Sequence, residues 1–464
     1  MCIRDSNYTT QDVYSLQPNL SWTHGKHLLH FGGEMRRYND NQLSAGLASG
    51  QYNFDKGWTQ ANPLQGDNTS GNAIASLLLG YPSSGNVDTL VNPAFRANYY
   101  ALFVQDDFKI TRRLTLNLGL RWDYETPREE RFNRMVRGFA FGQASPVATA
   151  VESSPAAAMC PACAAGLTGG LLYAGTSGDA RYAFIPHKLN FQPRLGMAYS
   201  LSPKFVLRGG WALSYLGQNS NGPQTGYSQS TSLVSSLDGG LTPAVSLSDP
   251  FPSSIYPNGL LKPIGNSQGL ATNLGQGISF QYLNRPLPYS QQYSAGFQYD
   301  LPVPGKWLVD ISYVGNQTQH LPVSLGLNFI PSNVLTSLPV DQRVNYFTQQ
   351  VANPMAGLLP NSSLNGSTIP LQQLLVAYPQ YSSVTMTDVP IGSQRYDAAQ
   401  MKLTHRFSYG LSMTVAYTNS KNLQRLTVLN PQDVNLSDVL KTPLEHRLVA
   451  YDVPQQLSLS LIHI

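Results

Sequence analysis

Apolar and polar residues alternate with a period of two along several long segments of this chain. The clearest covers residues 114–124, where even positions hold leucine, tryptophan or tyrosine and odd positions hold threonine, asparagine, glycine, arginine or aspartate. Because successive side chains of a β-strand point to opposite faces, this pattern predicts one strand with an apolar and a polar face. Soluble strands usually stop at about five or six residues, whereas a tilted strand needs about 9 to 11 to cross a bilayer. The segment is long enough to cross.

Similar segments recur in pairs that are joined by short turns. The predicted strands are residues 14–22, 28–38, 99–110, 114–124, 191–201, 205–215, 289–301, 307–315, 401–407 and 411–417, with a last one beginning near 453 or 457. Between the pairs lie long connections rich in Gly, Ser, Asn and Pro, at 39–97, 125–190, 216–288, 316–395 and 418–447. We expect these connections to be irregular loops. Short turns alternating with long loops predict an all-β fold, an antiparallel up-and-down transmembrane β-barrel with long extracellular loops.

Aromatic residues gather at both ends of the predicted strands. Phe108, Tyr199 and Trp307 lie beside short turns, whereas Trp122 and Tyr417 lie toward long loops. Strands favour aromatic residues in general, but this preference does not explain clustering at both ends. Two such belts are typical of barrels that cross a membrane.

Composition narrows the function classes. Charged residues make up 12% and aromatic residues 10% of the 464 residues, with 39 Gly and 32 Pro. We find no run near the roughly 18 apolar residues that a transmembrane helix needs. A barrel strand contains no such run either, because its apolar and polar residues alternate. The net charge of +4 comes from scattered residues without a basic run, so nucleic acid is not expected as a partner.

Both chain ends look foreign to the rest. Residues 1–6 lack the apolar core of a secretory signal, and residues 1–6 and 459–464 resemble translated adaptor sequence. We predict that both segments are non-native ends and that residues 7–458 form a partial barrel. Some eleven strands are visible, at about 42 residues per strand, which is about half of a 22-stranded transporter barrel.

Several stretches carry a family resemblance. Residues 98–109 read NYYALFVQDDFK and residues 114–127 read LTLNLGLRWDYETP; FQPRLGMAY from residue 191, YSQQYSAGFQ from 289, VDISYVGNQ from 309 and YDVPQQ from 451 agree with them. Together they resemble the barrel of TonB-dependent receptors, in the large subgroup with an N-terminal carboxypeptidase-regulatory-like domain. The likeness covers the strands, and the loops match little.

The resemblance implies a 22-stranded barrel that is filled by an N-terminal plug and sits in the outer membrane of a Gram-negative-type bacterium. Import would be driven by the TonB complex, which acts through the plug. The present sequence contains no recognisable plug, TonB-contacting segment or closing C-terminal strand, so energy coupling is not visible in these residues. The expected partners are therefore outer-membrane lipid, the TonB complex through a plug absent from this chain, and a large nutrient ligand at the outer loops.

The two closely spaced cysteines are the one motif with possible chemistry. Cys160 and Cys163 have the C-x-x-C spacing of redox pairs and zinc knuckles, but no second pair or histidine lies near them. We predict a loop disulfide. We find no catalytic constellation and expect no enzyme activity, cofactor or metal site.

The residues of most interest are the polar ones that alternation turns inward. In a soluble sandwich they would be the wet face, whereas in a barrel they line the lumen, where charge contacts the plug or tunes passage. For any one of them, a structural contact is the simpler role. The predicted lumen-facing residues are Asn117, Arg121, Asp123, Arg194, Arg208, Gln298, Asp300 and Lys402.

Three functions remain open. The leading one is a receptor and importer of a large nutrient, such as an oligosaccharide, a peptide or a metal chelate. The second is a surface or adhesion barrel without active import. The third is a secreted soluble all-β protein, which the lack of a catalytic constellation makes less attractive.

Overall fold

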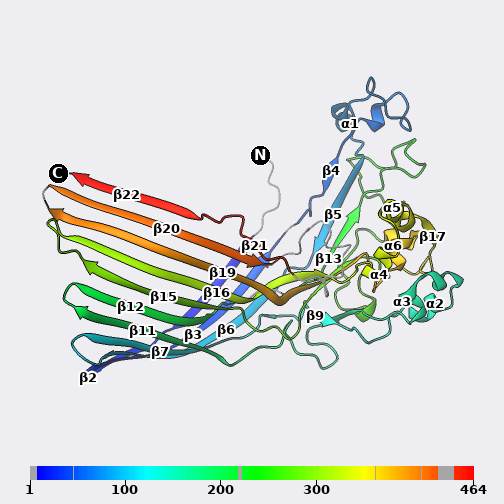
Figure 1. Cartoon of the computed structure of the whole chain (residues 1–464). Helices are drawn as coiled ribbons and strands as arrows, with labels where there is room; N and C mark the ends of the chain where they lie inside the picture. Colours follow the sequence, from blue (N-terminus) through cyan, green and yellow to red (C-terminus); the bar gives the residue numbers. More distant parts are fainter. Residues whose placement is uncertain are drawn as a thin grey trace.

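The computed structural model describes residues 8–44, 46–217, 222–360, 362–408, 410–426 and 444–463. Its main feature is a large curved antiparallel sheet, with the long connections gathered beyond one end of it (Figure 1). The long strands are β1 (Tyr8–Leu16), β2 (Asn19–His24), β3 (His27–Leu43), β6 (Ala94–Lys109), β7 (Leu114–Glu125), β11 (Asn190–Ser202), β12 (Phe205–Tyr215), β15 (Tyr289–Asp300), β16 (Trp307–Gly326), β19 (Ser383–Ser408), β20 (Leu411–Arg425) and β22 (Gln455–His463).

The strands pair in chain order. The order is β1-β3-β6-β7-β11-β12-β15-β16-β19-β20, and β22 pairs with β20. This antiparallel meander confirms the predicted fold class. Both β1 and β2 pair with β3, and Pro18, which has no backbone N–H to donate, lies at the break between them. Counting β1 and β2 as one, the described part of the sheet holds eleven long strands and is not closed into a ring, since no pairing joins β1 to β22.

The two faces of the sheet differ as the alternation predicts. The cross-strand register places Leu118 beside Leu195, which in turn lies beside Trp211. Leu118 is 38% and Leu120 44% exposed, so no second protein layer covers this face. We call it the outer face. An exposed apolar band of this kind is what a barrel turns toward lipid.

Several strands extend further toward the loops than the alternation predicts. β16 has 20 residues and β19 has 26, whereas alternation marks only residues 307–315 and 401–407. A strand that continues beyond the bilayer has water on both faces, so hydrogen bonds persist while the apolar period disappears. β22 includes residues 459–463; that these are non-native stays a prediction, and residues 1–6 lie outside the described residues.

The long connections are not irregular throughout, which corrects our expectation. They contain short elements, and among the described helices none has the length and hydrophobicity of a membrane span. These elements are β4 (Gln51–Asn53), η1 (Gly57–Thr59), α1 (Ala73–Leu79), β5 (Ser84–Leu90), β8 (Glu129–Glu130), β9 (Val136–Phe139), α2 (Ala148–Glu152), η2 (Pro155–Met159), α3 (Pro161–Ala164), β10 (Leu171–Tyr173), β13 (Ser228–Ser232), η3 (Gly269–Ala271), β14 (Gly277–Gln281), α4 (Ser332–Thr336), α5 (Val340–Thr348), β17 (Gln350–Ala352), η4 (Ser363–Asn365), β18 (Thr368–Pro370), α6 (Leu371–Leu374) and β21 (Arg447–Leu448).

The connections pack against one another around a shared apolar core. Phe139 stacks on Phe280 with ring centroids 5.1 Å apart, and Met355 and Tyr381 are fully buried in the same cluster. Burial raises the pKa of the Tyr381 hydroxyl, which therefore stays neutral. We call this assembly, built from residues 136–173, 227, 274–280 and 327–384, the loop layer. Its members come from segments too far apart in sequence for any periodicity to reveal them.

The structure records a disulfide between Cys160 and Cys163 inside the loop layer. Both cysteines are fully buried and belong to its apolar core. Reduction should therefore require the loop layer to open first. We expect that iodoacetamide labels neither cysteine in the folded protein with reductant present, and labels both after denaturation and reduction. Mass spectrometry of peptides measures this, and labelling of both thiols in the folded protein treated with reductant would contradict it.

Replacing both cysteines with serine tests how much this disulfide stabilises the loop layer. Because the bridge closes a loop of only a few residues, the chain-entropy argument predicts a loss of about 2 kcal/mol in loop-layer stability. Denaturant-dependent proteolysis of the loops reports this loss.

Candidate functional site

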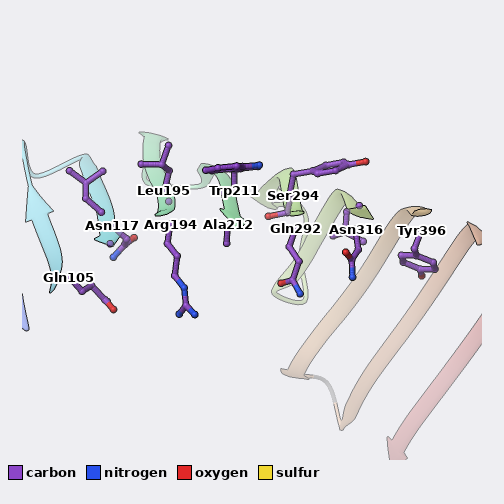
Figure 2. A pocket seen from close by; sticks show the side chains of 17 residues that line it. Gln105, Asn117, Arg194, Leu195, Trp211, Ala212, Gln292, Ser294, Asn316 and Tyr396 are labelled. Carbon is purple, nitrogen blue, oxygen red and sulfur yellow. The ribbon is translucent and has the colours of Figure 1, made fainter. Parts of the chain in front are cut away.

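The face of the sheet opposite the outer face is polar, and we call it the inner wall. The register connects Asn117 to Gly196, then Gly210 and Ser294, so these positions share one face across four strands. By the same register and alternation, all the predicted lumen-facing residues lie on the inner wall: Asn117, Arg121, Asp123, Arg194, Arg208, Gln298, Asp300 and Lys402. Figure 2 shows Gln105, Arg194, Gln292 and Tyr396 on one side of the sheet, with Leu195 and Trp211 on the other.

Arg121 is the centre of a charge cluster on the inner wall. Its Nη2 lies 2.9 Å from Glu34 Oε2 on β3 and donates to the Tyr99 hydroxyl on β6 at 2.8 Å. Glu34 also pairs with Arg36, which lies two residues further along β3 on the same face. Three neighbouring strands thus contribute to one network, and a charged network with several partners holds its side chains in fixed positions.

Asp123 extends this network to a fourth strand. Its Oδ2 accepts a hydrogen bond from the Tyr99 hydroxyl at 3.1 Å and one from the Gln192 side chain on β11, and lies 3.7 Å from Arg121 Nε. We refer to Glu34, Arg36, Tyr99, Arg121, Asp123 and Gln192 as the inner-wall charge cluster.

Beside the charge cluster the inner wall is hollowed. A shallow cavity of about 590 Å³ lies over β7, β11, β12, β15, β16 and β19, with Asn117, Arg194, Gln292, Asn316 and Tyr396 around it (Figure 2). Gly196 and Gly210 lie side by side in it and carry no side chain into the space. The hollow is therefore a place where a partner can approach the backbone closely, with amide and guanidinium groups at its edge.

The other predicted residues lie apart from the charge cluster. Arg208 donates to Gln298 at 3.1 Å across β12 and β15. Lys402 lies opposite Asp310 in the register of β16 and β19. Asp300 ends β15 at its short turn, far from Arg121 and Asp123. The inner wall thus carries charges along its whole height.

Several members of the charge cluster were not predicted from the sequence, because their contacts depend on which strands lie side by side. Glu34, Tyr99 and Gln192 belong to the charge cluster but were not among the predicted residues. Glu34 contacts Arg121 across 87 positions of sequence, so only the strand order reveals the contact. A signal for Tyr99 did exist, because alternation on β6 places it on the polar face.

A buried ion pair joins the connection before β15 to β19 at the rim of the sheet. Arg285 is 1% exposed, its Nη1 lies 3.0 Å from Asp388 Oδ2, and its guanidinium carbon lies 3.8 Å from the centroid of the Phe184 ring. Burial lowers the pKa of Arg285, and Asp388 opposes this shift. Arg285 joins the connection before β15 to β19, which carries Asp388.

Within the described ranges, no group of three or more His, Cys, Asp or Glu side chains is placed to hold a metal. The Ser408 hydroxyl lies 3.0 Å from His405 Nε2, which is the spacing of a nucleophile and its base. However, His405 Nδ1 contacts the Leu411 carbonyl at 3.0 Å and Ser408 donates to the Gly305 carbonyl, so this contact holds two turns together.

Distant similarities to solved structures exist. The outer membrane transporter YddB from Escherichia coli is 8% identical with a TM-score of 0.45, covering 98% of this chain and 40% of that chain. The alcaligin outer membrane receptor FauA from Bordetella pertussis is 8% identical with a TM-score of 0.37, covering 98% and 43%. The copper transporter OprC is 8% identical with a TM-score of 0.39, covering 90% and 38%. The chain spans less than half the length of each.

No curated protein matches this sequence. A family model described as the outer membrane beta barrel domain matches residues 3–463, which is nearly the whole chain. The match agrees with the meander, the apolar outer face and the polar inner wall. The chain therefore belongs to the outer membrane beta barrel domain family, whose place is the outer membrane of Gram-negative bacteria.

Proposed function

We propose that the chain is the barrel of an outer-membrane receptor that imports a large nutrient, such as an oligosaccharide, a peptide or a metal chelate. The observation that carries this proposal is the inner wall, where a network of charges borders an open hollow on the face turned away from lipid. Charged and amide groups beside an open hollow can bind polar groups of a plug or of a passing nutrient. Membership of an outer-membrane family argues against the secreted soluble alternative.

The energy for import would come from the TonB complex acting through a plug domain that packs on the inner wall. The charge cluster supports this part of the proposal, because Arg121 and Asp123 are held in place by neighbours on the wall itself. Fixed charges can bind complementary charges on a plug without first losing side-chain freedom. The hollow beside them would receive a bulky plug group or the passing nutrient.

Nutrient capture would take place at the loop layer. A cleft of about 400 Å³ lies there, with Gln229, Lys262, Gln268 and Asn273 along it and Leu358 among its apolar residues. Carboxamides both donate and accept hydrogen bonds, which suits hydroxyl or peptide groups of a ligand.

A pair of neighbouring glycines gives a matched test of the inner wall. Gly210 faces the hollow and Gly209 the outer face, and a Cβ at either meets its nearest atom at 3.3 or 3.4 Å. We expect Gly210→Leu to fill the hollow and lower nutrient uptake by about tenfold, because passage depends on the free width. Gly209→Leu should leave uptake unchanged.

Uptake by cells expressing each variant of the full-length protein measures this effect, with heat-dependent gel mobility as a check that both barrels assemble. If Gly210→Leu assembles and imports at the normal rate, the inner wall is not the route of uptake.

A surface or adhesion barrel without import is the second candidate. The packed core of the loop layer favours it, since a fixed outer surface suits attachment to a partner. Deleting TonB separates the two functions. Import should stop in the deletion strain, whereas an adhesion barrel would retain its full binding of cells or matrix.

A further inference from the structure

We infer that the outer face carries a site for the phosphate of an anionic lipid in the surrounding membrane, formed by Arg395 and Lys421. This site lies on the opposite face from the inner wall and has no part in the proposed uptake. It requires only that the outer face meets lipid. It rests on a cluster of polar contacts on the outer face, at the edge of the apolar band.

The cluster lies on the outer face by register. Tyr293, Gly315, Asp397 and Lys421 are consecutive cross-strand neighbours on β15, β16, β19 and β20. Tyr293 also lies opposite Trp211, an outer-face residue whose side chain points away from the hollow (Figure 2). A carboxylate and two cations therefore face the lipid side of the sheet.

Three donors converge on the Asp397 carboxylate. Oδ1 accepts hydrogen bonds from the Tyr293 hydroxyl at 2.9 Å and the Tyr313 hydroxyl at 2.5 Å, and Oδ2 accepts one from Arg395 Nε at 2.6 Å. A charge turned toward lipid is costly unless it is paired, and these donors satisfy it. Asp397 in turn fixes the position of Arg395.

A glycine makes the arrangement possible. The Tyr293 ring lies over Gly315, where an added Cβ would come within 2.2 Å of Tyr293 Cε2. The absent side chain thus lets the ring lie flat across β16 with its hydroxyl directed to β19, as aromatic rings do over glycines in strands. The contact is a specific feature of the local packing.

The cluster lies at the height of lipid headgroups. Asp397 is eleven positions from Ser408, the last residue of β19. At about 3.3 Å per residue and a tilt of about 40°, this is on the order of 28 Å above the short turn, just outside an apolar band about 25 Å tall. Outer-face residues of β20 change from Val415 and Tyr417 to Asn419 and Lys421 at the same level.

Charge complementarity identifies the occupant. Arg395 and Lys421 against Asp397 leave one net positive charge. The Arg395 side chain is 57% exposed, its Nε is bound to Asp397 Oδ2, and it also has a side-chain hydrogen bond with Tyr313. A guanidinium presents a planar fork that matches phosphate oxygens, and an exposed ammonium adds a second charge. At headgroup height the phosphate of an anionic lipid is the matching group.

Lipid retention tests the site. The full-length protein is placed in phosphatidylcholine nanodiscs with increasing phosphatidylglycerol, and bound phosphatidylglycerol is counted by native mass spectrometry. We expect Arg395→Gln and Lys421→Gln each to weaken retention of one phosphatidylglycerol by about tenfold, the effect of losing one charge-assisted contact. Lys402→Gln removes the same charge from the opposite face of β19 and should change nothing. Equal retention in all variants would overturn the inference.

A fourth variant separates lipid binding at a positioned Arg395 from attraction of anionic lipid by net charge alone. Asp397→Asn makes the surface more positive, so attraction by net charge alone would strengthen lipid retention. If Asp397 positions Arg395, the same variant weakens retention, and Tyr293→Phe, which leaves every charge in place, weakens it to a smaller degree. Stronger retention by Asp397→Asn would refute the positioning role, whatever the outcome of the uptake assays.

Discussion

Replacing Arg285 with methionine should destabilise the packing of the connection before β15 by about 3 to 5 kcal/mol, the cost of removing one partner from a buried ion pair. Arg285 is 1% exposed, pairs with Asp388 and packs on Phe184. Methionine keeps much of the apolar stem but leaves the Asp388 carboxylate without this cation. Because Arg285 joins the connection before β15 to β19, the loops should open while the sheet stays folded. Hydrogen exchange of loop and strand peptides measures both.

Arg131→Met is the matched control. Arg131 is an exposed residue in the connection after β7, and its guanidinium carbon lies 5.3 Å from the centroid of the Phe132 ring, so this surface contact should contribute no more than about 1 kcal/mol. Similar loop exchange in the two variants would mean that Arg285 does not hold the connection before β15 to the rim.

Leu120→Arg should cost about 2 to 4 kcal/mol and impair assembly, because it places an unpaired charge in the middle of the lipid-facing band. Leu120 lies on the outer face between Val104 and Pro193, with 44% of its surface exposed. Folding into lipid vesicles followed by urea titration gives the difference in free energy of unfolding.

A position on the opposite face of the same strand supplies the control. Asn117 lies on the inner wall, and its side-chain nitrogen donates to Asp107 Oδ1 at 2.6 Å. An arginine introduced at 117 would face water and could pair with the same carboxylate, so Asn117→Arg should cost far less. Equal losses from the two substitutions would contradict the facing of β7.

Alternation predicted the membrane-crossing part of the sheet because one face of each strand meets lipid. Residues 114–124 were predicted and β7 runs Leu114–Glu125; residues 205–215 match β12 (Phe205–Tyr215). The same reasoning found only residues 401–407 of β19, which begins at Ser383. Above the bilayer both faces of this strand meet water, so apolar and polar residues do not alternate in that part of it.

The candidate site was predictable in part for a similar reason. Alternation turns Arg121 and Asp123 inward, and they lie on the inner wall. Their partner Glu34 was not predictable, since the contact depends on β3 lying beside β6 and β6 beside β7. The loop layer was missed because its core joins Phe139 to Phe280 and Tyr381, from three separate connections.

The parallel pairing of β14 with β19 has a consequence for the order of folding. β14 (Gly277–Gln281) precedes β15 in the chain, yet its partners Ser383 to Thr387 follow β16. Neighbouring hairpins close locally and fast, whereas this pairing spans more than a hundred residues and forms slowly. While the sheet forms at the membrane, the segment around β14 stays unpaired until β19 has joined it, which leaves the segment open to proteases and chaperones in the interval.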